Sequence, residues 1–100
     1  MSNGIEQMQT EFHNKATALF FPVYHAFENA VAGVSRKNQE FRFQQLKKQY
    51  AATLEQELQM AAKDILKTYK DEKHLKEADQ MLHGFIKDYL HRFIQKINDL

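Results

Sequence analysis

The stretch Leu19-Phe20-Phe21-Pro22-Val23-Tyr24-His25-Ala26-Phe27 decides how this chain folds, because it sets four aromatic residues and a proline inside a long helical pattern. It holds three of the eight phenylalanines and the only proline of the chain. Apolar residues recur at steps of three and four on both sides of it, which predicts an amphipathic helix over residues 4–32. On a wheel of about 100° per residue, most of them share a sector about 140° wide, and Phe21 lies about 60° beyond its edge.

Pro22 is the irregular feature of this helix. A proline has no backbone N–H, and its ring clashes with the carbonyl group four residues earlier, which here belongs to Ala18. We therefore predict that the first helix is kinked at Pro22 or split at Phe20-Phe21.

The first helix is expected to end at Gly33, since glycine suits the left-handed conformation that closes many helices. Ser35 can then cap a second helix over residues 36–69. The apolar stripe of this helix is narrow, and Lys47 interrupts it near its start. We expect that end to be weakly packed or buried against something polar.

A polar gap at residues 70–74 contains neither glycine nor proline, so one continuous helix from Arg36 to Leu100 is an alternative. The next apolar face lies about 90° from the extrapolated stripe of the second helix, which favours a break with Asp71 as N-cap. The third helix is then expected over residues 72–98. Its apolar sector is about 180° wide, more than one antiparallel neighbour needs, and Gly84 lies on the opposite face.

These three helices predict an all-α fold, an elongated up-down-up three-helix bundle that forms a single domain over residues 1–100. The absence of cysteine excludes disulfides, thiolate metal sites and cysteine nucleophiles. We expect no membrane span and no signal peptide, and hence a cytoplasmic protein. The net charge of +1 does not by itself imply a polyanionic partner.

The surplus apolar width of the first and third helices is the main functional clue. It predicts a non-enzymatic protein–protein interaction module that self-associates as a homo-oligomer, with a dimer favoured, or docks a partner helix. Aromatic side chains are preferred interface anchors, so Phe20, Phe21 and Tyr24 are the candidate partner-binding residues. The alternative is that these aromatic residues form a core layer against the other two helices.

A second hypothesis is a nucleic-acid-associated regulator that uses the basic segment 36–48. This segment has five cationic residues against Glu40 alone, but the wheel scatters them around the helix, so a solvated helix start is the alternative. The cationic residues are Arg36, Lys37, Arg42, Lys47 and Lys48.

Catalysis and metal binding are not predicted. The only serines are Ser2 and Ser35, and no glycine-rich phosphate loop is present. Histidines pair with carboxylates at helical spacing, but on polar faces or, for one pair, at the edge of an apolar stripe, which predicts surface or edge histidines without a metal or other cofactor. The pairs are His25 with Glu28, Asp79 with His83, and Asp88 with His91.

Overall fold

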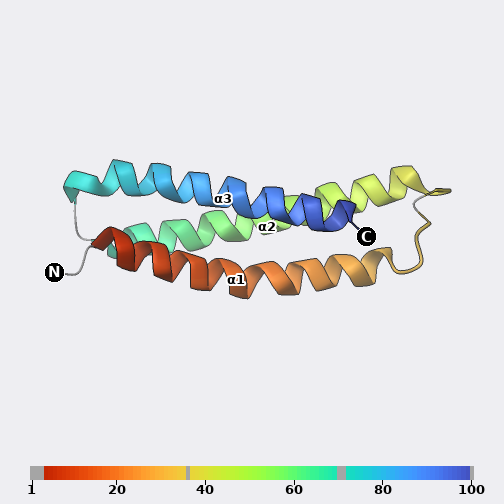
Figure 1. The fold of residues 1–100 in the computed structure, drawn as a ribbon, viewed down its shortest axis with the longest axis horizontal. Coiled ribbons are helices and arrows are strands. Elements are labelled where there is room, and N and C mark those ends of the chain that lie inside the picture. The colour runs from red at the N-terminus through yellow and green to blue at the C-terminus, as the bar shows by residue number, and fades with distance from the viewer. Residues whose placement is uncertain (1–3, 36, 70–71, 100) are drawn as a thin grey trace.

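The computed structural model describes residues 4–35, 37–69 and 72–99, and three long helices make up most of this part of the chain. They are α1 (Gly4–Val31), α2 (Glu40–Thr68) and α3 (Leu75–Asn98), with a short 3-10 helix η1 (Glu72–His74) leading into α3. Figure 1 shows α1 and α3 running in the same direction and α2 returning between their ends. The predicted all-α, up-down-up three-helix bundle is confirmed.

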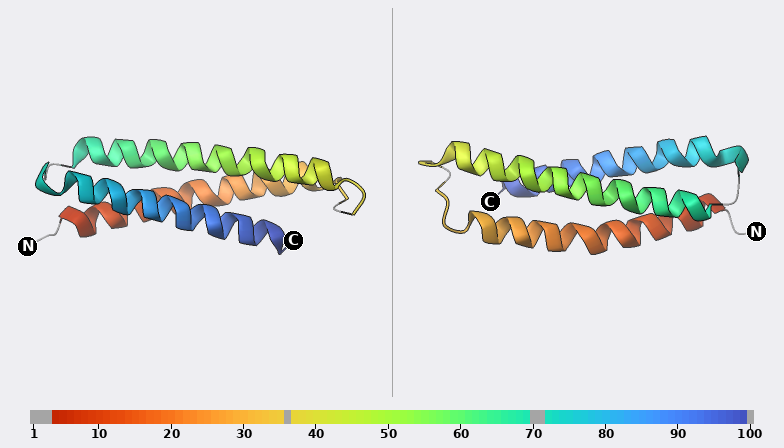
Figure 2. Two further views of the ribbon diagram at one scale, coloured as in Figure 1. Left: turned by 90° about the horizontal axis from the view of Figure 1, so that it is seen from above. Right: turned by 180° about the vertical axis from the view of Figure 1, so that it is seen from behind.

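The bundle is markedly elongated. Its principal extents are 55 × 19 × 19 Å and its radius of gyration is 16.0 Å, whereas a compact domain of this length has about 13 Å. Figure 2 shows that the hairpin of α1 and α2 extends past the C-terminal end of α3. The long α1–α2 seam is therefore the principal helix–helix contact.

Pro22 lies inside α1 without splitting it, so the alternative of two separate segments is wrong. Figure 1 shows α1 as a bowed but continuous rod. Pro22 is exposed, whereas Phe20 and Val23 beside it are buried in the core. Packing on both sides of the proline holds the helix together, and the ring that would clash within a straight helix faces outward.

The end of α1 differs from the prediction. Gly33 does not adopt a positive φ, so its expected left-handed conformation is wrong. The chain leaves α1 through tightened turns instead, in which Ala32 N donates to Asn29 O at 3.4 Å and Val34 N donates to Val31 O at 2.9 Å. These bonds span three residues, as in a 3-10 turn, and satisfy the last carbonyl groups without a left-handed residue.

The second helix begins at Glu40, so the predicted start at residue 36 is wrong, and Arg36 lies outside the described residues. Ser35 does act as a cap, because its Oγ accepts from Asn38 N at 3.2 Å, but it caps a single turn. Gln39 closes that turn through its backbone N–H to Ser35 O at 2.7 Å, with φ −130° and ψ 43°. This non-helical backbone separates the capped turn from α2.

The predicted break between the second and third helices is confirmed. The second helix ends at Thr68, and Tyr69 is extended, with φ −75° and ψ 119°. The predicted N-cap, Asp71, lies outside the described residues. The third helix, α3, packs antiparallel to α2.

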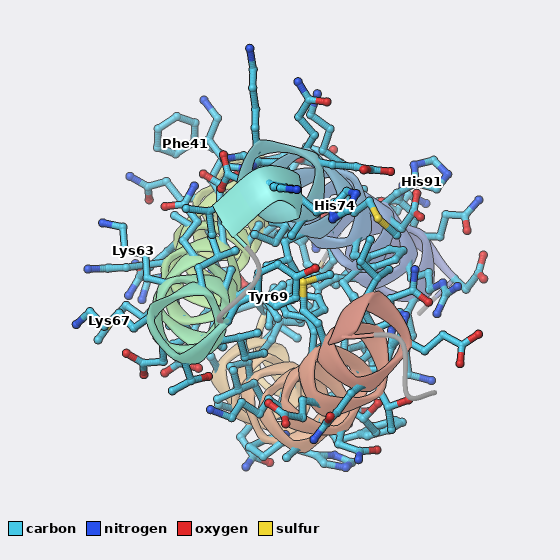
Figure 3. All side chains as sticks on the ribbon, turned by 90° about the vertical axis from the view of Figure 1, so that its left-hand side faces the viewer. Phe41, Lys63, Lys67, Tyr69, His74 and His91 are labelled. Carbon is cyan, nitrogen blue, oxygen red and sulfur yellow. The ribbon has the colours of Figure 1, made fainter. Side chains whose placement is uncertain are left out.

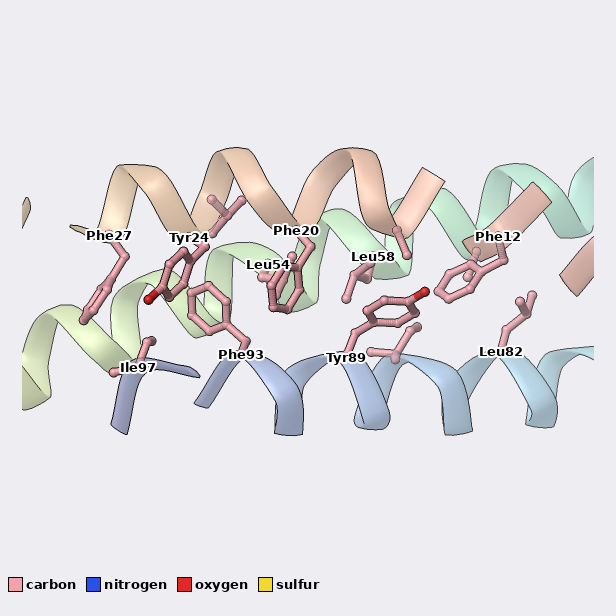
Figure 4. Close-up of a cluster of buried hydrophobic side chains, with 14 of the residues drawn as sticks. Phe12, Phe20, Tyr24, Phe27, Leu54, Leu58, Leu82, Tyr89, Phe93 and Ile97 are labelled. Atoms are coloured by element: carbon pink, nitrogen blue, oxygen red, sulfur yellow. The ribbon is translucent and has the colours of Figure 1, made fainter. Parts of the chain in front are cut away.

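The core is a ladder of aromatic rings between α1 and α3, closed on the third side by Leu54 and Leu58 of α2 (Figure 4). At one end of the ladder, Phe43 and Tyr50 of α2 add their rings against Phe27. The ring of Phe93 is fully buried and meets those of Phe20, Tyr24 and Phe27 at centroid distances of 5.7, 6.2 and 6.4 Å. The first two contacts are near-perpendicular, at 88°, and the third is edge-on at 67°, arrangements that the ring quadrupole favours. Other fully buried side chains are Phe12, Leu54, Leu58, Leu82 and Ile97.

The wide apolar sector of α3 is largely used within the bundle. Phe85 contacts the rings of Phe12 and His13 on α1, and Leu90 and Ile94 are half-buried against the core. A helix in a three-helix bundle has two neighbours, and a sector about 180° wide serves both. The surplus predicted for α3 therefore supplies intramolecular contacts.

Lys47, which interrupts the stripe of α2, is half-buried and meets the end of α3. Its Nζ donates a hydrogen bond to Asn98 Oδ1 at 2.9 Å. The ammonium group thereby lies near the helix C-terminus, where a cation is favourable. We expected this end of the second helix to be either weakly packed or buried against a polar group. The second expectation describes Lys47.

Replacing Phe93 with alanine is expected to lower the free energy of unfolding by about 3–5 kcal/mol, because the substitution empties the centre of the aromatic ladder. Urea denaturation followed by circular dichroism measures this loss. The matched control is Phe41→Ala, since Phe41 is 77% exposed and should change stability by no more than about 0.5 kcal/mol. Equal effects of the two substitutions would contradict the assigned core.

Replacing Gly84 with alanine is expected to raise the free energy of unfolding by about 1 kcal/mol, because an exposed mid-helix glycine loses only conformational freedom. A Cβ built on Gly84 has no neighbouring atom within 4 Å. Gly4→Ala is the control, since a Cβ there would lie 3.3 Å from Tyr69 Cε1 and the gain should be smaller. A destabilised Gly84→Ala variant would show that another surface approaches this position.

Candidate interaction surface

The structure separates the three candidate partner-binding residues. Phe20 and Tyr24 are buried, with 8% and 5% of their surface exposed, and both contact the ring of Phe93. Phe21 is 48% exposed and touches Phe20 edge-to-face at 5.5 Å. Only Phe21 among them presents an aromatic surface to a partner, while Phe20 supports it from below.

Phe21 belongs to an exposed face of α1 that carries no formal charge. Between Ala16 and Phe27 the exposed side chains are polar-uncharged, histidine, apolar or proline. We call this surface the outer α1 face, and it consists of Thr17, Ala18, Phe21, Pro22, His25 and Ala26. Solvated helix faces normally carry charged side chains, so this half of α1 lacks a typical polar side.

A groove along the α1–α2 seam adjoins the outer α1 face. It consists of two hollows of about 450 and 370 Å³ that share Ala18, Leu19 and Glu57 and so form one continuous depression. We call it the α1–α2 groove. Its α1 wall runs from Lys15 to Ala26, and its α2 wall consists of Tyr50, Thr53, Glu57, Met60, Ala61 and Asp64.

Small side chains keep the groove open. Ala18 and Ala26 on α1, together with Ala61 on α2, leave space that larger side chains would fill. The side chain of Met60, 59% exposed, lines the same space, and methionine adapts readily to a docked surface. The groove and the outer α1 face together offer a mostly apolar surface along three turns of α1.

A sequence signal for this surface exists, although the apolar pattern alone does not reveal it. Between Lys15 and Arg36 the only formally charged residue is Glu28. More than a quarter of all residues in the chain are charged, so a gap of this length is unusual for a helix whose one side faces water. A scan of the sequence for long stretches with few charged residues would identify the outer α1 face.

Two further exposed apolar residues lie elsewhere. Phe41 is 77% exposed near the start of α2 and points away from the bundle in the end-on view of Figure 3. Leu75 is 39% exposed at the start of α3. Scattered single residues of this kind are common on soluble proteins and define no continuous surface.

The basic segment does not form one cationic face in the described residues. Arg42 and Lys48 are exposed but stand six positions apart on α2, which separates them by about 120° around the helix. Lys37 is exposed in the preceding turn, Lys47 is bonded to the end of α3, and Arg36 lies outside the described residues. No geometric observation therefore favours the nucleic-acid hypothesis.

His13 has a role that its sequence context did not indicate. It is half-buried on the seam between α1 and α3, where its Nδ1 is hydrogen-bonded to Tyr89 Oη at 2.8 Å. Its ring also lies 4.7 Å from that of Phe85. The partners are 76 residues away in sequence, so only the packed bundle reveals that this histidine is structural.

The histidine–carboxylate pairs lie on the surface. His25 Nδ1 is 2.9 Å from Glu28 Oε1, and His83 Nδ1 is 3.4 Å from Asp79 Oδ1. All four side chains are more than a third exposed. Within the described ranges, no three histidine, aspartate or glutamate side chains converge as metal ligands would.

Burial raises the pKa of the Tyr24 hydroxyl above its usual range, and the carboxylates of Glu28 and Asp99 add to the effect. The ammonium group of Lys96 lies 4.9 Å from the centre of the same ring, in cation–π geometry. Tyr24 therefore stays neutral under ordinary conditions and contributes packing to the floor beneath the outer α1 face.

Comparisons of this chain with models of protein families, with curated proteins and with solved structures find no match. In the part of the chain that the structure describes, no helix combines the length and apolar character needed to cross a bilayer.

Tyr24→Phe is expected to reduce the loss of stability at high pH. Since the folded state raises the pKa of Tyr24, stability is present below the unfolded value of about 10 and declines as pH rises through the folded value. Urea denaturation at about pH 8 and pH 10.5 measures this dependence. Tyr50→Phe is the control, and an identical pH dependence in the wild type and Tyr24→Phe would contradict the prediction.

Proposed function

We propose that this protein is a non-enzymatic helical interaction module that binds an α-helix, either from a second copy or from a partner protein. The contact surface is the outer α1 face together with the α1–α2 groove. The single observation that carries the proposal is the exposed, uncharged side of α1 around the 48% exposed ring of Phe21.

The shape of the groove supports a helical partner. Its α1 wall spans twelve residues, from Lys15 to Ala26, which corresponds to roughly 17 Å or about three helical turns. Small residues let a second helix approach closely, and the side chains of Leu19 and Met60 supply apolar contacts along the groove. A helix laid in this groove would extend the three-helix bundle to a four-helix arrangement.

The energetics support a contact of modest strength. Full burial of a phenylalanine contributes about 1.5–3 kcal/mol, and about half of the Phe21 surface remains to be covered. Leu19 and Met60 add apolar area along the groove. A contact of this size is expected in a reversible complex rather than in an obligate one.

The chemistry of the surface supports binding rather than catalysis. The charged side chains of the α1–α2 groove are Lys15, Glu57 and Asp64, and no serine or histidine lines it. A nucleophile and a base converging in one pocket would be needed for hydrolytic chemistry. The surface instead resembles the apolar centre and polar rim of a binding interface.

The experiment combines sedimentation velocity with binding of the apolar dye ANS to the intact protein. We expect either self-association or a monomer whose dye fluorescence falls in the Phe21→Glu variant, since the charge disrupts the exposed apolar surface. Phe41→Glu is the matched control, because it changes an even more exposed phenylalanine outside that surface. A monomer that binds no dye would overturn the proposed function.

A further inference from the structure

We infer that the helix bound in the α1–α2 groove carries a lysine or arginine in the middle of its apolar face, which pairs with Glu57. This inference rests on the proposed function and names the chemistry of the partner, a basic amphipathic helix of another protein. The juxtaposition that carries it is a half-buried glutamate that lines both hollows of the groove and has no partner among the described residues.

Glu57 lies in the middle of the groove. It lines both hollows, and the residues that do so with it are Ala18 and Leu19 of α1. Among the described residues that line the hollow of about 370 Å³, Glu57 is the only one with a formal charge. One carboxylate side chain therefore stands among uncharged side chains at the centre of the depression.

The bundle itself does not neutralise Glu57 by a direct contact. Within the described residues, neither a hydrogen bond nor an ion pair holds its carboxylate. A lysine or arginine three or four positions away along α2 could pair with it, but those positions carry no cation. They are occupied by Thr53, Leu54, Met60 and Ala61.

Lys15 is the cation of the groove, and it lies at one end. It lines the hollow of about 450 Å³ together with Glu57 and Asp64. Because α1 and α2 are antiparallel, Lys15 and Asp64 lie at the same end, and Glu57 lies toward the middle. One ammonium group thus serves two carboxylates, which leaves one negative charge in excess along the groove.

The excess charge determines which helix the groove accepts. A helix laid over Glu57 removes water from its half-buried side chain, which costs free energy unless a cation takes the place of that water. A lysine or arginine in the middle of the apolar face supplies this cation. Apolar residues one turn to either side of it would then lie over the two hollows. An entirely apolar helix would leave the carboxylate covered and unpaired, so the groove discriminates against it.

The same argument disfavours α1 of a second copy as the occupant. From Ala16 to Phe27 this helix has no formally charged residue, so its apolar stretch would cover Glu57 without supplying a cation. The occupant is therefore a helix whose apolar face is interrupted by one basic residue.

The test uses the intact protein and two designed peptides of about 18 residues, a length at which a helix can form readily. Both consist of alanine and glutamine, with leucine one turn before and one turn after a central position. That position holds lysine in one peptide and methionine in the other. Fluorescence anisotropy of the labelled peptides, at protein concentrations up to about 1 mM, gives both dissociation constants. We expect the lysine peptide to bind about tenfold more tightly than the methionine peptide.

Charge variants of the protein assign this preference to Glu57. Glu57→Gln should weaken binding of the lysine peptide about tenfold and should not weaken binding of the methionine peptide. Glu57→Lys should favour a third peptide with a central glutamate over the lysine peptide. Asp64→Asn is the matched control, because it removes an exposed carboxylate from the same wall, and it should change binding by less than about twofold.

A steric variant locates the peptides in the groove. Ala18→Arg puts a long side chain between the two hollows and should abolish binding of both peptides. Phe41→Arg is its control, because Phe41 is exposed outside the groove, and it should leave binding unchanged. Circular dichroism and urea denaturation check that each variant is folded. Peptide binding that survives Ala18→Arg would contradict the assigned site.

Three other outcomes would overturn the inference. Equal affinity of the wild-type protein for the lysine and methionine peptides would remove the basic contact and leave helix binding intact. Absence of binding of either peptide would exclude this kind of partner, and the proposed function itself fails only if the protein is also a monomer that binds no dye. Self-association that survives Glu57→Gln and blocks peptide binding would show that a second copy covers the groove without a basic contact.

Discussion

The edge-on packing of Phe93 against the aromatic residues of α1 is the interaction on which the rest of the structure depends. Its ring meets Phe20, Tyr24 and Phe27 over successive turns, so this end of α3 is held against the C-terminal half of α1. This packing accounts for the continuity of α1 through Pro22. A proline sacrifices one backbone hydrogen bond, and buried residues on both sides of it compensate through tertiary contacts.

The same packing explains why a helix with aromatic residues on two sides has one of them in solvent. Phe20 and Tyr24 pack against Phe93 of α3, and Phe27 also meets the rings of Phe43 and Tyr50 on α2. Phe21 follows Phe20 by about 100° around the helix and cannot reach either neighbour fully. Its exposure is a geometric consequence of a bundle with three helices.

Much of the fold could be predicted from the sequence, and much of the surface could not. Steps of three and four in the apolar pattern identify three helices, and the phase change after Tyr69 identifies the break before α3. The pattern gave a start for the second helix four residues too early, because Ser35 caps a separate turn that Gln39 ends. Single-residue caps do not reveal how far the helix behind them continues.

The sequence by itself determined the helical architecture, the absence of cysteine chemistry and the charge-free side of α1, because periodicity and charge depend only on residue order. Tertiary structure decided which apolar residues remain exposed to solvent. The wide apolar sector of α3 packs against two neighbouring helices. His13 is hydrogen-bonded to Tyr89, which lies 76 residues further along the chain. Burial depends on the number and placement of neighbouring helices, so only the packed bundle shows that Phe20 and Tyr24 are core while Phe21 remains available.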